Sequence, residues 1–570
     1  MGGREPRVFV SSLPGEEAFH LLCGREPGPA WVGDRPFPHW LAADLARQAR
    51  EALASLPPRG DKRRFLRAAV RRRLRRWGRP ADFHWEPLVP RAPPVLDDSA
   101  PVLAALRGRL LYAAELELML KRRGWTGEVE PVLAGLAARG LIEAHPAVEV
   151  LHFGRAVCRR CGETDLARED CWFCGDRHCW TCPSCSALGP SRGCRTLYGA
   201  AQDTSGPPRD ARPVFAYALT PAQERAAASL REFLAGGRGG DFLVWAVCGA
   251  GKTEVILEGM APVVACGGRV LLATPRREIA AELAGRVAAA LPGLPMAVHY
   301  GGRHEEPGED AAVTVATTHQ CLRFYRGFDL AVLDEVDAFP FHGSRMLYDA
   351  VWRARRPGGR VVYLTATPPP ALAERLAGGS LPFVRLPVRP HGHPLPVPEL
   401  VRMRLGEPGA GWRLPAGLAA LWESPGRRPG LVFVPSVAAA SAVGRELVRW
   451  GAARGIRTAF VHAADAERER KRAAFVQGRC DLLVTTTLLE RGLTLGALDV
   501  YVLFADCEAV FDAACLIQMA GRAGRLADDP AAKVLLIGER LSPAMRAARQ
   551  AVMEANEEAA RGGFLTGAAP

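Results

Sequence analysis

The sequence has no long hydrophobic run and no apolar segment at its start. No stretch of about 18 consecutive apolar residues occurs, which argues against a transmembrane helix. Residues 1–22 lack the apolar core of a signal peptide, so we expect a cytoplasmic protein. The composition excludes the disordered and fibrous classes, because 48% of the 570 residues are hydrophobic and 24% are charged.

Length and charge limit the organisation and the partners. A chain of 570 residues is too long for one hydrophobic core, so we expect about three or four domains. A net charge of +13 and a pI near 9.3 favour a polyanionic partner, either nucleic acid or an anionic membrane face. An arginine-rich composition alone gives the same balance. Residues 62–77 predict an amphipathic basic helix, suited to phosphate backbones or a membrane surface, or else a solvated charged face.

The first 201 residues divide into two segments. Residues 1–150 form a basic extension that we expect to be rich in helices. Within it, residues 106–121 and 128–139 predict two helices and residues 141–151 an extended segment, which together resemble a winged-helix arrangement. Residues 151–201 form a module in which cysteines are concentrated.

Two α/β domains follow, at residues 214–388 and 399–545, with a C-terminal tail at 546–570. Proline-rich linkers at residues 202–213 and 387–398 precede them. In both domains short apolar runs alternate with helical stretches, which predicts parallel sheets flanked by helices and a ligand cleft at the carboxyl ends of the strands. The predicted strands are 242–247, 269–273, 297–300, 313–316, 330–333 and 361–364, then 430–434, 458–462, 481–485, 500–504 and 533–537.

The string A-V-C-G-A-G-K-T at residues 246–253 lies between a predicted strand and a predicted helix, and predicts a phosphate-binding loop. Backbone N–H groups there can face a polyphosphate at the positive end of the helix. Lys252 would reach the β- and γ-phosphates, and the Thr253 hydroxyl would bind Mg²⁺. The string departs from the general pattern at Ala246, where a glycine is usual. The predicted phosphate-binding residues are Gly249, Ala250, Gly251, Lys252 and Thr253.

Acidic and basic side chains complete a hydrolytic site. The strand at 330–333 delivers Asp334 to its carboxyl end, where it would hold Mg²⁺, and Glu335 would polarise the attacking water. The strand at 361–364 ends in a hydroxyl-bearing turn, Thr365-Ala366-Thr367. In the second domain, Arg522 and Arg525 lie about one helical turn apart and would reach the γ-phosphate across the cleft. Gly521 and Gly524 are costly in a helix unless close approach requires them.

These motifs resemble those of superfamily 2 helicases and translocases, whose motors are two tandem RecA-like domains. The resemblance covers residues 220–526 and explains Ala246 as a family variant. It implies ATP as the nucleotide, Gln223 on the adenine, Gly492 on the nucleotide, and Gln518 beside the two catalytic arginines. Hydroxyls and backbone amides suit a sequence-independent grip on phosphates. The DNA-binding residues implied are Thr274, Arg276, Thr317, Thr318, Ser436, Thr485 and Arg491.

Eight of the 15 cysteines fall between residues 158 and 194. Clustered cysteines in a reducing compartment indicate a metal more often than disulfides. The two C-x-x-C-G knuckles predict one tetrahedral Zn²⁺ site, and the glycines favour zinc over an iron–sulfur cluster. The following C-x-x-C-x-x-C run predicts a second zinc site, completed by Cys194 or His178. The first site would use Cys158, Cys161, Cys171 and Cys174, and the second Cys179, Cys182 and Cys185.

A cysteine module directly before the first motor domain resembles the ComFA family of natural transformation, with D-E-V-D-A-F-P and L-L-E-R-G-L-T as further shared strings. The primosomal helicases share many motor motifs but carry their cysteines within the second half of the motor. Residues 1–150 lie outside the family pattern.

The ComFA resemblance implies an ATP-dependent single-stranded DNA translocase, cytoplasmic and peripheral at the inner face of the membrane. Its partners would be single-stranded DNA, the membrane uptake channel, a phosphoribosyltransferase-like competence protein and a recombination mediator, with oligomerisation left open. Two alternatives remain from the sequence: a replication-restart or repair helicase, and a zinc-dependent nucleic-acid-binding scaffold with an ATP-controlled switch.

Overall fold

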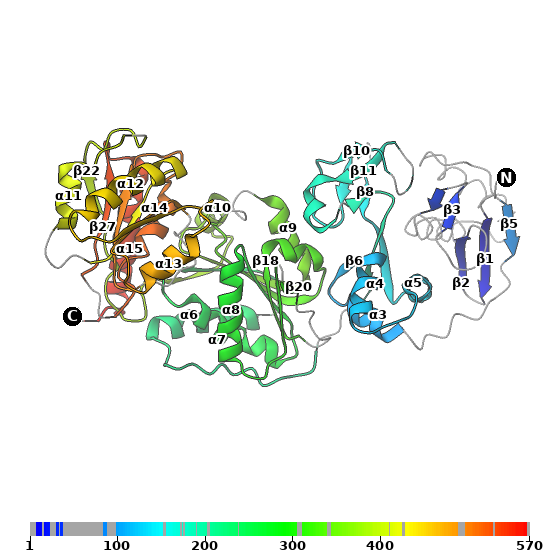
Figure 1. The fold of residues 1–570 in the computed structure, drawn as a ribbon. Helices are drawn as coiled ribbons and strands as arrows, with labels where there is room; N and C mark the ends of the chain where they lie inside the picture. The colour runs from blue at the N-terminus through cyan, green and yellow to red at the C-terminus, as the bar shows by residue number, and fades with distance from the viewer. Residues whose placement is uncertain are drawn as a thin grey trace.

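A computed structural model (Figure 1) provides the structure of the chain. It describes strands within residues 7–37 and 84–87, and then the chain from residue 99 to 566. The gaps in that longer part are 152–154, 172–173, 175–176, 190, 202–205, 237–238, 302, 305–310, 339–343, 410, 424–427, 488–495 and 528–530. Among the described residues, no helix combines the length and apolar composition needed to cross a bilayer.

The described residues before position 99 are all in strands. The rest of this segment lies outside the described residues, so the expected helix-rich extension stays a prediction there. The strands β2 (Glu16–Leu22), β1 (Arg7–Leu13) and β5 (His84–Pro87) form one sheet in that order. A separate pair joins β3 (Ala30–Val32) to β4 (Arg35–Phe37). The predicted basic helix at 62–77 lies outside the described residues.

A small module of helices and short strands follows, and its winged-helix character stays a prediction. An antiparallel sheet of order β6-β13-β7 packs against the helices, which bury Leu106, Leu116 and Leu136. The predicted helix at 106–121 is interrupted, because residues 110–112 form a strand. The elements are α3 (Ser99–Leu106), β6 (Leu110–Tyr112), α4 (Ala113–Arg122), α5 (Val129–Ala138), β7 (Ile142–Pro146) and β13 (Thr196–Ala200).

The cysteine module is an insertion between β7 and β13 of this helical module. The predicted boundary at residue 150 therefore does not separate two domains, since β13 returns after the cysteines to complete the sheet. The inserted elements are β8 (Val148–Val150), β9 (Ala156–Cys158), β10 (Ala167–Glu169), β11 (Cys179–Cys182), the 3-10 helix η2 (Pro183–Leu188) and β12 (Ser191–Arg192).

The first motor lobe is an eight-stranded sheet of order β17-β16-β18-β15-β19-β20-β14-β21, parallel except for β17. Helices lie on both faces, as the alternation of apolar runs predicts (Figure 1). The elements are α6 (Pro221–Ala235), β14 (Gly240–Ala246), α7 (Lys252–Ala265), β15 (Val270–Thr274), α8 (Arg277–Ala290), β16 (Met296–Tyr300), β17 (Arg303–His304), β18 (Val313–Thr317), η3 (Thr318–Arg323), β19 (Phe328–Asp334), α9 (Arg345–Ala354), β20 (Arg355–Thr365), α10 (Pro370–Ala377) and β21 (Phe383–Leu386).

The second lobe has a six-stranded, all-parallel sheet of order β22-β27-β26-β23-β25-β24. Together the two sheets confirm the predicted pair of tandem RecA-like domains. The elements are β22 (Glu399–Arg402), α11 (Ala416–Glu423), β23 (Gly430–Phe433), α12 (Val437–Ala452), β24 (Thr458–Val461), α13 (Arg468–Val476), β25 (Leu482–Thr485), β26 (Asp499–Leu503), α14 (Ala513–Ala520), β27 (Val534–Gly538) and α15 (Pro543–Arg561).

The last helix, α15, joins the two lobes and is not a separate tail. The boundary predicted at residue 545 falls inside it. Met545 and Ala548 are buried in a core cluster of the second lobe, whereas Ala559 is buried in a core cluster of the first. The Asn556 side chain bonds both the N–H and the C=O of Leu395 in the linker, at 2.7 and 2.9 Å. The helix therefore holds the linker in place.

Candidate nucleotide site between the lobes

The phosphate-binding loop has the predicted strand–loop–helix context. Strand β14 ends at Ala246 and helix α7 begins at Lys252. Gly249 and Gly251 both have φ of 81°, a left-handed conformation that favours glycine. A Cβ at Gly251 would lie 2.2 Å from Nε2 of Gln223, so a larger residue would clash. The backbone here is shaped to present N–H groups at a helix start.

The Gln223 side chain links helix α6 to the phosphate-binding loop through hydrogen bonds. It is buried at the start of α6, where its Oε1 accepts from the Thr220 N–H at 3.0 Å. Its Nε2 donates to the carbonyl oxygen of Ala250 at 3.1 Å. The side chain thus ties the capping box of α6 to the loop. Its predicted role on the adenine stays a prediction.

Lys252 faces the acidic residues at the end of β19. Its Nζ lies 3.4 Å from Oδ1 of Asp334. Burial disfavours the charged form of Lys252, but the carboxylates of Asp334 and Glu335 outweigh that effect and raise its pKa. Lys252 is therefore charged near neutral pH and can pass from a carboxylate to a phosphate.

Two features of the acidic motif suit hydrolysis with Mg²⁺. Thr253 and Asp334 both line a cavity of about 20 Å³ whose other walls are apolar, and a hydroxyl and a carboxylate are oxygen ligands of the kind that Mg²⁺ prefers. Glu335 has φ of 53°, which is uncommon for a residue with a side chain. Its backbone N–H donates to Oδ1 of Asp334 at 2.9 Å. Such backbone strain is concentrated at functional sites.

Asp337 connects three motifs, a role that the sequence analysis did not assign to it. Its Oδ1 accepts from the Thr365 hydroxyl at 2.7 Å, and its Oδ2 from the Thr367 hydroxyl at 2.6 Å. Gln518 of the second lobe also donates to Oδ2, through Nε2 at 3.1 Å. The Cys248 thiol in turn donates to Oε1 of Gln518 at 3.0 Å. Gln518 thus contacts the phosphate-binding loop and the acidic motif together.

The two predicted catalytic arginines lie in a turn, because α14 ends at Ala520. We call residues 521–525 the arginine turn. The prediction that Arg522 and Arg525 are spaced along a helix is therefore wrong. Arg525 Nε donates to the Gly521 carbonyl at 2.9 Å, and Arg522 is buried. Burial lowers the pKa of Arg525, opposed by the nearby Cys248 and Glu335. Arg525 therefore lies at the cleft, near Cys248 and Glu335, and its guanidinium remains charged there despite burial.

Close approach explains the glycines of this turn, as the sequence predicted. A Cβ at Gly521 would lie 2.4 Å from Cβ of Cys248 in the phosphate-binding loop. Gly524 has φ of 63°, and a Cβ there would lie 2.8 Å from Cγ of Pro396. Side chains at either position would push the lobes apart.

The residues implied for DNA binding are arranged less simply. Thr274, Thr317, Thr318 and Thr485 are all buried. Their hydroxyls therefore do not offer the surface grip that was expected, and any contact there would use backbone groups. Ser436 accepts from the Ala439 N–H at 3.0 Å and caps α12, while Arg276 begins α8 with a half-buried side chain. Arg491 and Gly492 lie outside the described residues.

The cysteines form two quartets, but the predicted grouping is wrong. One quartet is Cys158, Cys161, Cys182 and Cys185, and the other is Cys171, Cys174, Cys179 and Cys194; in each, the sulfur atoms lie within 4.8 Å of one another. Antiparallel pairing of β10 with β11 aligns Glu169 with Cys179 and folds the chain back on itself. The knuckle at 158–161 consequently meets 182–185, and 171–174 meets 179 and 194. The spacing of the cysteines in the sequence does not by itself predict which pairs come together.

Both quartets fit a tetrahedral metal. Sulfur–sulfur distances are 3.6 Å for Cys158 and Cys185, 3.4 Å for Cys161 and Cys182, and 3.7 Å for Cys171 and Cys194. Tetrahedral Zn²⁺ with Zn–S bonds of about 2.3 Å separates its sulfurs by about 3.8 Å. Small shifts would therefore complete either site.

The first quartet packs directly on the motor. Its four cysteines share a buried cluster with Leu322, Val336 and Leu347 of the first lobe. Arg353 of α9 donates to the carbonyl oxygens of Arg159 and Arg160 in the knuckle. The cysteine module is thus fixed to the lobe that binds the phosphate.

Two adjacent parallel-sheet lobes, with a phosphate-binding loop and acidic motif facing an arginine turn, define a helicase-type ATPase of superfamily 2. The family model described as "DEAD/DEAH box helicase" matches residues 220–376, and "Helicase conserved C-terminal domain" matches residues 417–527. This class uses ATP and Mg²⁺.

Comparison with curated proteins narrows the class. The competence protein ComFA of Bacillus subtilis (strain 168) is 34% identical over 433 residues, which cover 74% of this chain and 90% of that protein. ComFA of Streptococcus pneumoniae (strain ATCC BAA-255 / R6) is 33% identical over 427 residues, covering 74% and 95%. The chain belongs to the ComFA family and is a competence-related helicase-like ATPase. Among solved structures, the chain is similar to S. cerevisiae Dbp5 bound to RNA and ADP BeF3, with 19% identity and a TM-score of 0.43. The match covers 59% of this chain and 88% of the Dbp5 chain.

We expect Lys252→Ala to lower the kcat of ATP hydrolysis by about 10²–10³-fold, because it removes the positive charge nearest the developing phosphate charge. Steady-state phosphate release measures the effect. Lys471→Ala is the matched control. Lys471 lies on α13, outside the nucleotide site, and pairs with Asp465 at 2.7 Å. Equal rates for the Lys252 variant and the wild-type chain would contradict the site assignment.

Proposed function

We propose that this protein is an ATP-driven translocase of single-stranded DNA that draws an incoming strand into the cytoplasm during natural transformation. The observation that carries the proposal is the contact of Gln518 with both Cys248 and Asp337. One residue of the second lobe touches the two nucleotide motifs of the first. Membership of the ComFA family supports the link to DNA uptake.

Hydrolysis follows from the chain's own residues. ATP would supply the phosphoanhydride bond, and a bound Mg²⁺ would supply charge neutralisation of the phosphates. Lys252, Thr253 and Asp334 would hold the nucleotide and its metal, and Glu335 would orient the attacking water. Arg522 and Arg525 stabilise the negative charge that develops on the transferred phosphoryl group. The arginines come from the opposite lobe, so full activity requires the closed arrangement.

Closure of the cleft converts hydrolysis into movement. Each lobe carries segments at the carboxyl ends of its strands that we assign to the DNA backbone, with backbone groups making the contact where the threonine side chains are buried: Thr274, Arg276, Thr317 and Thr318 on the first, and Ser436 and Thr485 on the second. Arg491, outside the described residues, is assigned to the same grip from the family resemblance. The spacing between the two grips changes as the lobes close and open. A strand held alternately by one grip and the other advances past the motor. The net charge of +13 favours such a polyanionic track.

Each cysteine quartet would hold one Zn²⁺. The first zinc would anchor the module on the first lobe, and the second would stabilise its distal part. We assign this module and the residues before it to contacts with DNA or with the uptake apparatus. The protein partners would be the membrane channel, a phosphoribosyltransferase-like competence protein and a recombination mediator. The protein would act on the cytoplasmic face of the membrane.

We expect single-stranded DNA to stimulate ATP hydrolysis several-fold more than duplex DNA, with little separation of forked duplexes. Glu335→Gln should abolish the stimulated rate and leave DNA binding intact, because it removes the group that orients water. Phosphate release and a strand-separation assay measure the two activities. The apparent affinity for single strands should fall with salt, with a log–log slope of about −0.7 for each phosphate contacted.

Other outcomes of these assays would support one of the two alternative functions. Efficient unwinding of forked duplexes would replace the translocase with a restart or repair helicase. Turnover that DNA does not change would leave a zinc-dependent scaffold with an ATP-controlled switch.

Paired serine substitutions test the zinc sites and their grouping. The double variant Cys158→Ser/Cys182→Ser touches one quartet and should keep the other zinc, whereas Cys158→Ser/Cys171→Ser touches both and should lose both metals. Atomic emission on the purified full chain measures zinc per polypeptide. Loss of both metals in Cys158→Ser/Cys182→Ser and of only one in Cys158→Ser/Cys171→Ser would support the grouping predicted from the sequence. A wild-type chain without zinc would contradict both groupings.

A further inference from the structure

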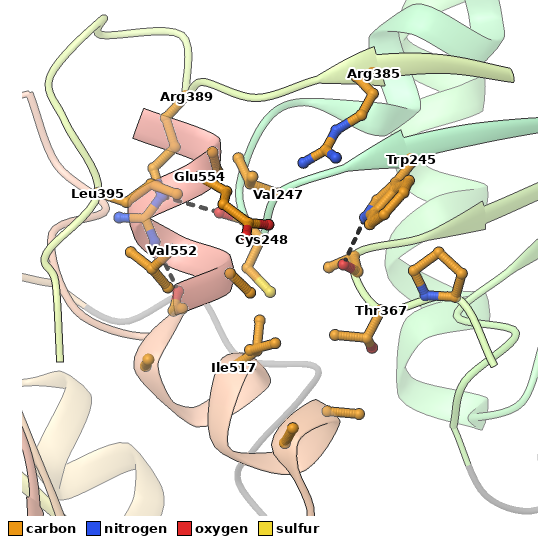
Figure 2. A pocket seen from close by; sticks show the side chains of 18 of the residues that line it. Trp245, Val247, Cys248, Thr367, Arg385, Arg389, Leu395, Ile517, Val552 and Glu554 are labelled. Carbon is orange, nitrogen blue, oxygen red and sulfur yellow. Dashed lines mark hydrogen bonds between the residues drawn. The ribbon is translucent and has the colours of Figure 1, made fainter. Parts of the chain in front are cut away.

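The linker between the lobes contains an arginine whose hydrogen bonds reach both sides of the cleft. Arg389 is 2% exposed although it lies in a proline-rich connection. Its Nε donates to the carbonyl oxygen of Cys248 at 2.9 Å, in the phosphate-binding loop. Its Nη1 donates to the Ala523 carbonyl at 2.6 Å and also to that of Gly524, and its Nη2 donates to the Gly521 carbonyl at 3.1 Å. Figure 2 shows Arg389 reaching toward Cys248.

These acceptors suit a cation. Three of them belong to the arginine turn, directly after the C-terminal end of α14, where the helix dipole places partial negative charge. A guanidinium has five N–H donors in a fixed plane, so one side chain can serve acceptors from two lobes at once. A buried cation needs such partners, and all four are available together only when the lobes are closed.

Two glycines lie beside this side chain. A Cβ at Gly249 of the phosphate-binding loop would lie 3.4 Å from Nε of Arg389, and a Cβ at Gly524 would lie 3.4 Å from its Nη1. The backbones of both motifs therefore approach the guanidinium closely. His391 adds a second contact from the linker, because its Nε2 lies 3.2 Å from the Gly524 carbonyl oxygen.

Apolar packing covers only part of this side of the interface. An open cavity of about 300 Å³ lies between the lobes, lined by Trp245 and Val247 of the first lobe, Ile517 of α14 and Val552 of α15 (Figure 2). Val247 also packs against the buried cluster that contains Val552, so some apolar contact crosses the interface. The polar contacts of Arg389 and Gln518 act together with this packing in positioning the arginine turn.

We propose that Arg389 is a positioning residue for ATP hydrolysis, which places the arginine turn against the phosphate-binding loop in the closed state. It touches backbone carbonyls and acts through Arg522, Arg525 and the loop. This role rests on the ATP-driven closure proposed above and adds that the linker itself sets the catalytic register. A lysine cannot replace it, because an ammonium lacks the planar fork that spans the two lobes.

The test uses the full chain with Arg389→Lys and Arg389→Gln. We expect kcat per nucleotide-binding site to fall about 10²-fold, the scale expected when catalytic groups are misplaced by about 1 Å. Affinity for a fluorescent ATP analogue should change less than about three-fold, because Lys252 and the loop glycines remain. Added guanidinium ion should restore part of the kcat of Arg389→Ala and none of that of Lys252→Ala.

Arg375→Lys is the matched control, since Arg375 forms a bidentate ion pair with Asp241 inside the first lobe, at 2.5 and 2.8 Å. It should keep the wild-type kcat. An unchanged kcat in both the Lys and the Gln variants of Arg389, or a loss of nucleotide affinity equal to the loss of kcat, would overturn the proposal. Basal turnover without DNA gives the readout. A failure of DNA to stimulate the wild-type chain would therefore bear on the translocase proposal and leave this result interpretable.

Discussion

The backbone of the arginine turn lies against the phosphate-binding loop, with room for only a hydrogen on Gly521, since a Cβ there would be 2.4 Å from Cβ of Cys248. The site depends on this contact. Gln518, one turn earlier on α14, then reaches Asp337, whose carboxylate also binds the hydroxyls of Thr365 and Thr367. Hydrogen bonds to charged groups contribute about 1.5–3 kcal/mol each. A shift of the second lobe would break the Gln518 bond to this carboxylate, while the two threonine hydroxyls, which belong to the first lobe, would stay on it.

The two connections between the lobes, the linker and helix α15, also support the contact of the arginine turn with the phosphate-binding loop. Helix α15 leaves the core of the second lobe and ends in the core of the first, and Asn556 pairs with Leu395 of the linker. Arg385 at the end of β21 pairs with Glu558 of the same helix at 2.9 Å and stacks 4.0 Å above the Trp245 ring. The lobes are thus joined by the linker and by α15. Two connections restrict their relative motion to a hinge more than one connection would.

Much of the motor could be predicted from sequence because its signals are local. The apolar runs give most of the central strands within one or two residues, although β20 begins six residues before its predicted start. The G-A-G-K-T string marks the phosphate-binding loop without any knowledge of tertiary contacts. The edge strands β21 and β22 carry weaker patterns, since edge positions are less buried. Asp337 and Arg389 were missed for another reason. Their roles depend on partners 181 and 141 residues away in the chain, which no local window contains.

The cysteine module shows the same limit more sharply. Spacing of the C-x-x-C knuckles correctly indicates paired ligands, but which knuckle meets which is decided by the β10–β11 hairpin. The module is also inserted into the sheet of the helical module, so that β13, which follows the quartets in the chain, returns to pair with β6 and β7. Because Cys158, Cys161, Cys182 and Cys185 are buried against the first lobe, their ordering and that of the motor surface are coupled. An insertion with so little apolar core of its own cannot order itself by burial alone. The thiol quartets and the Arg353 contacts therefore supply what its packing lacks.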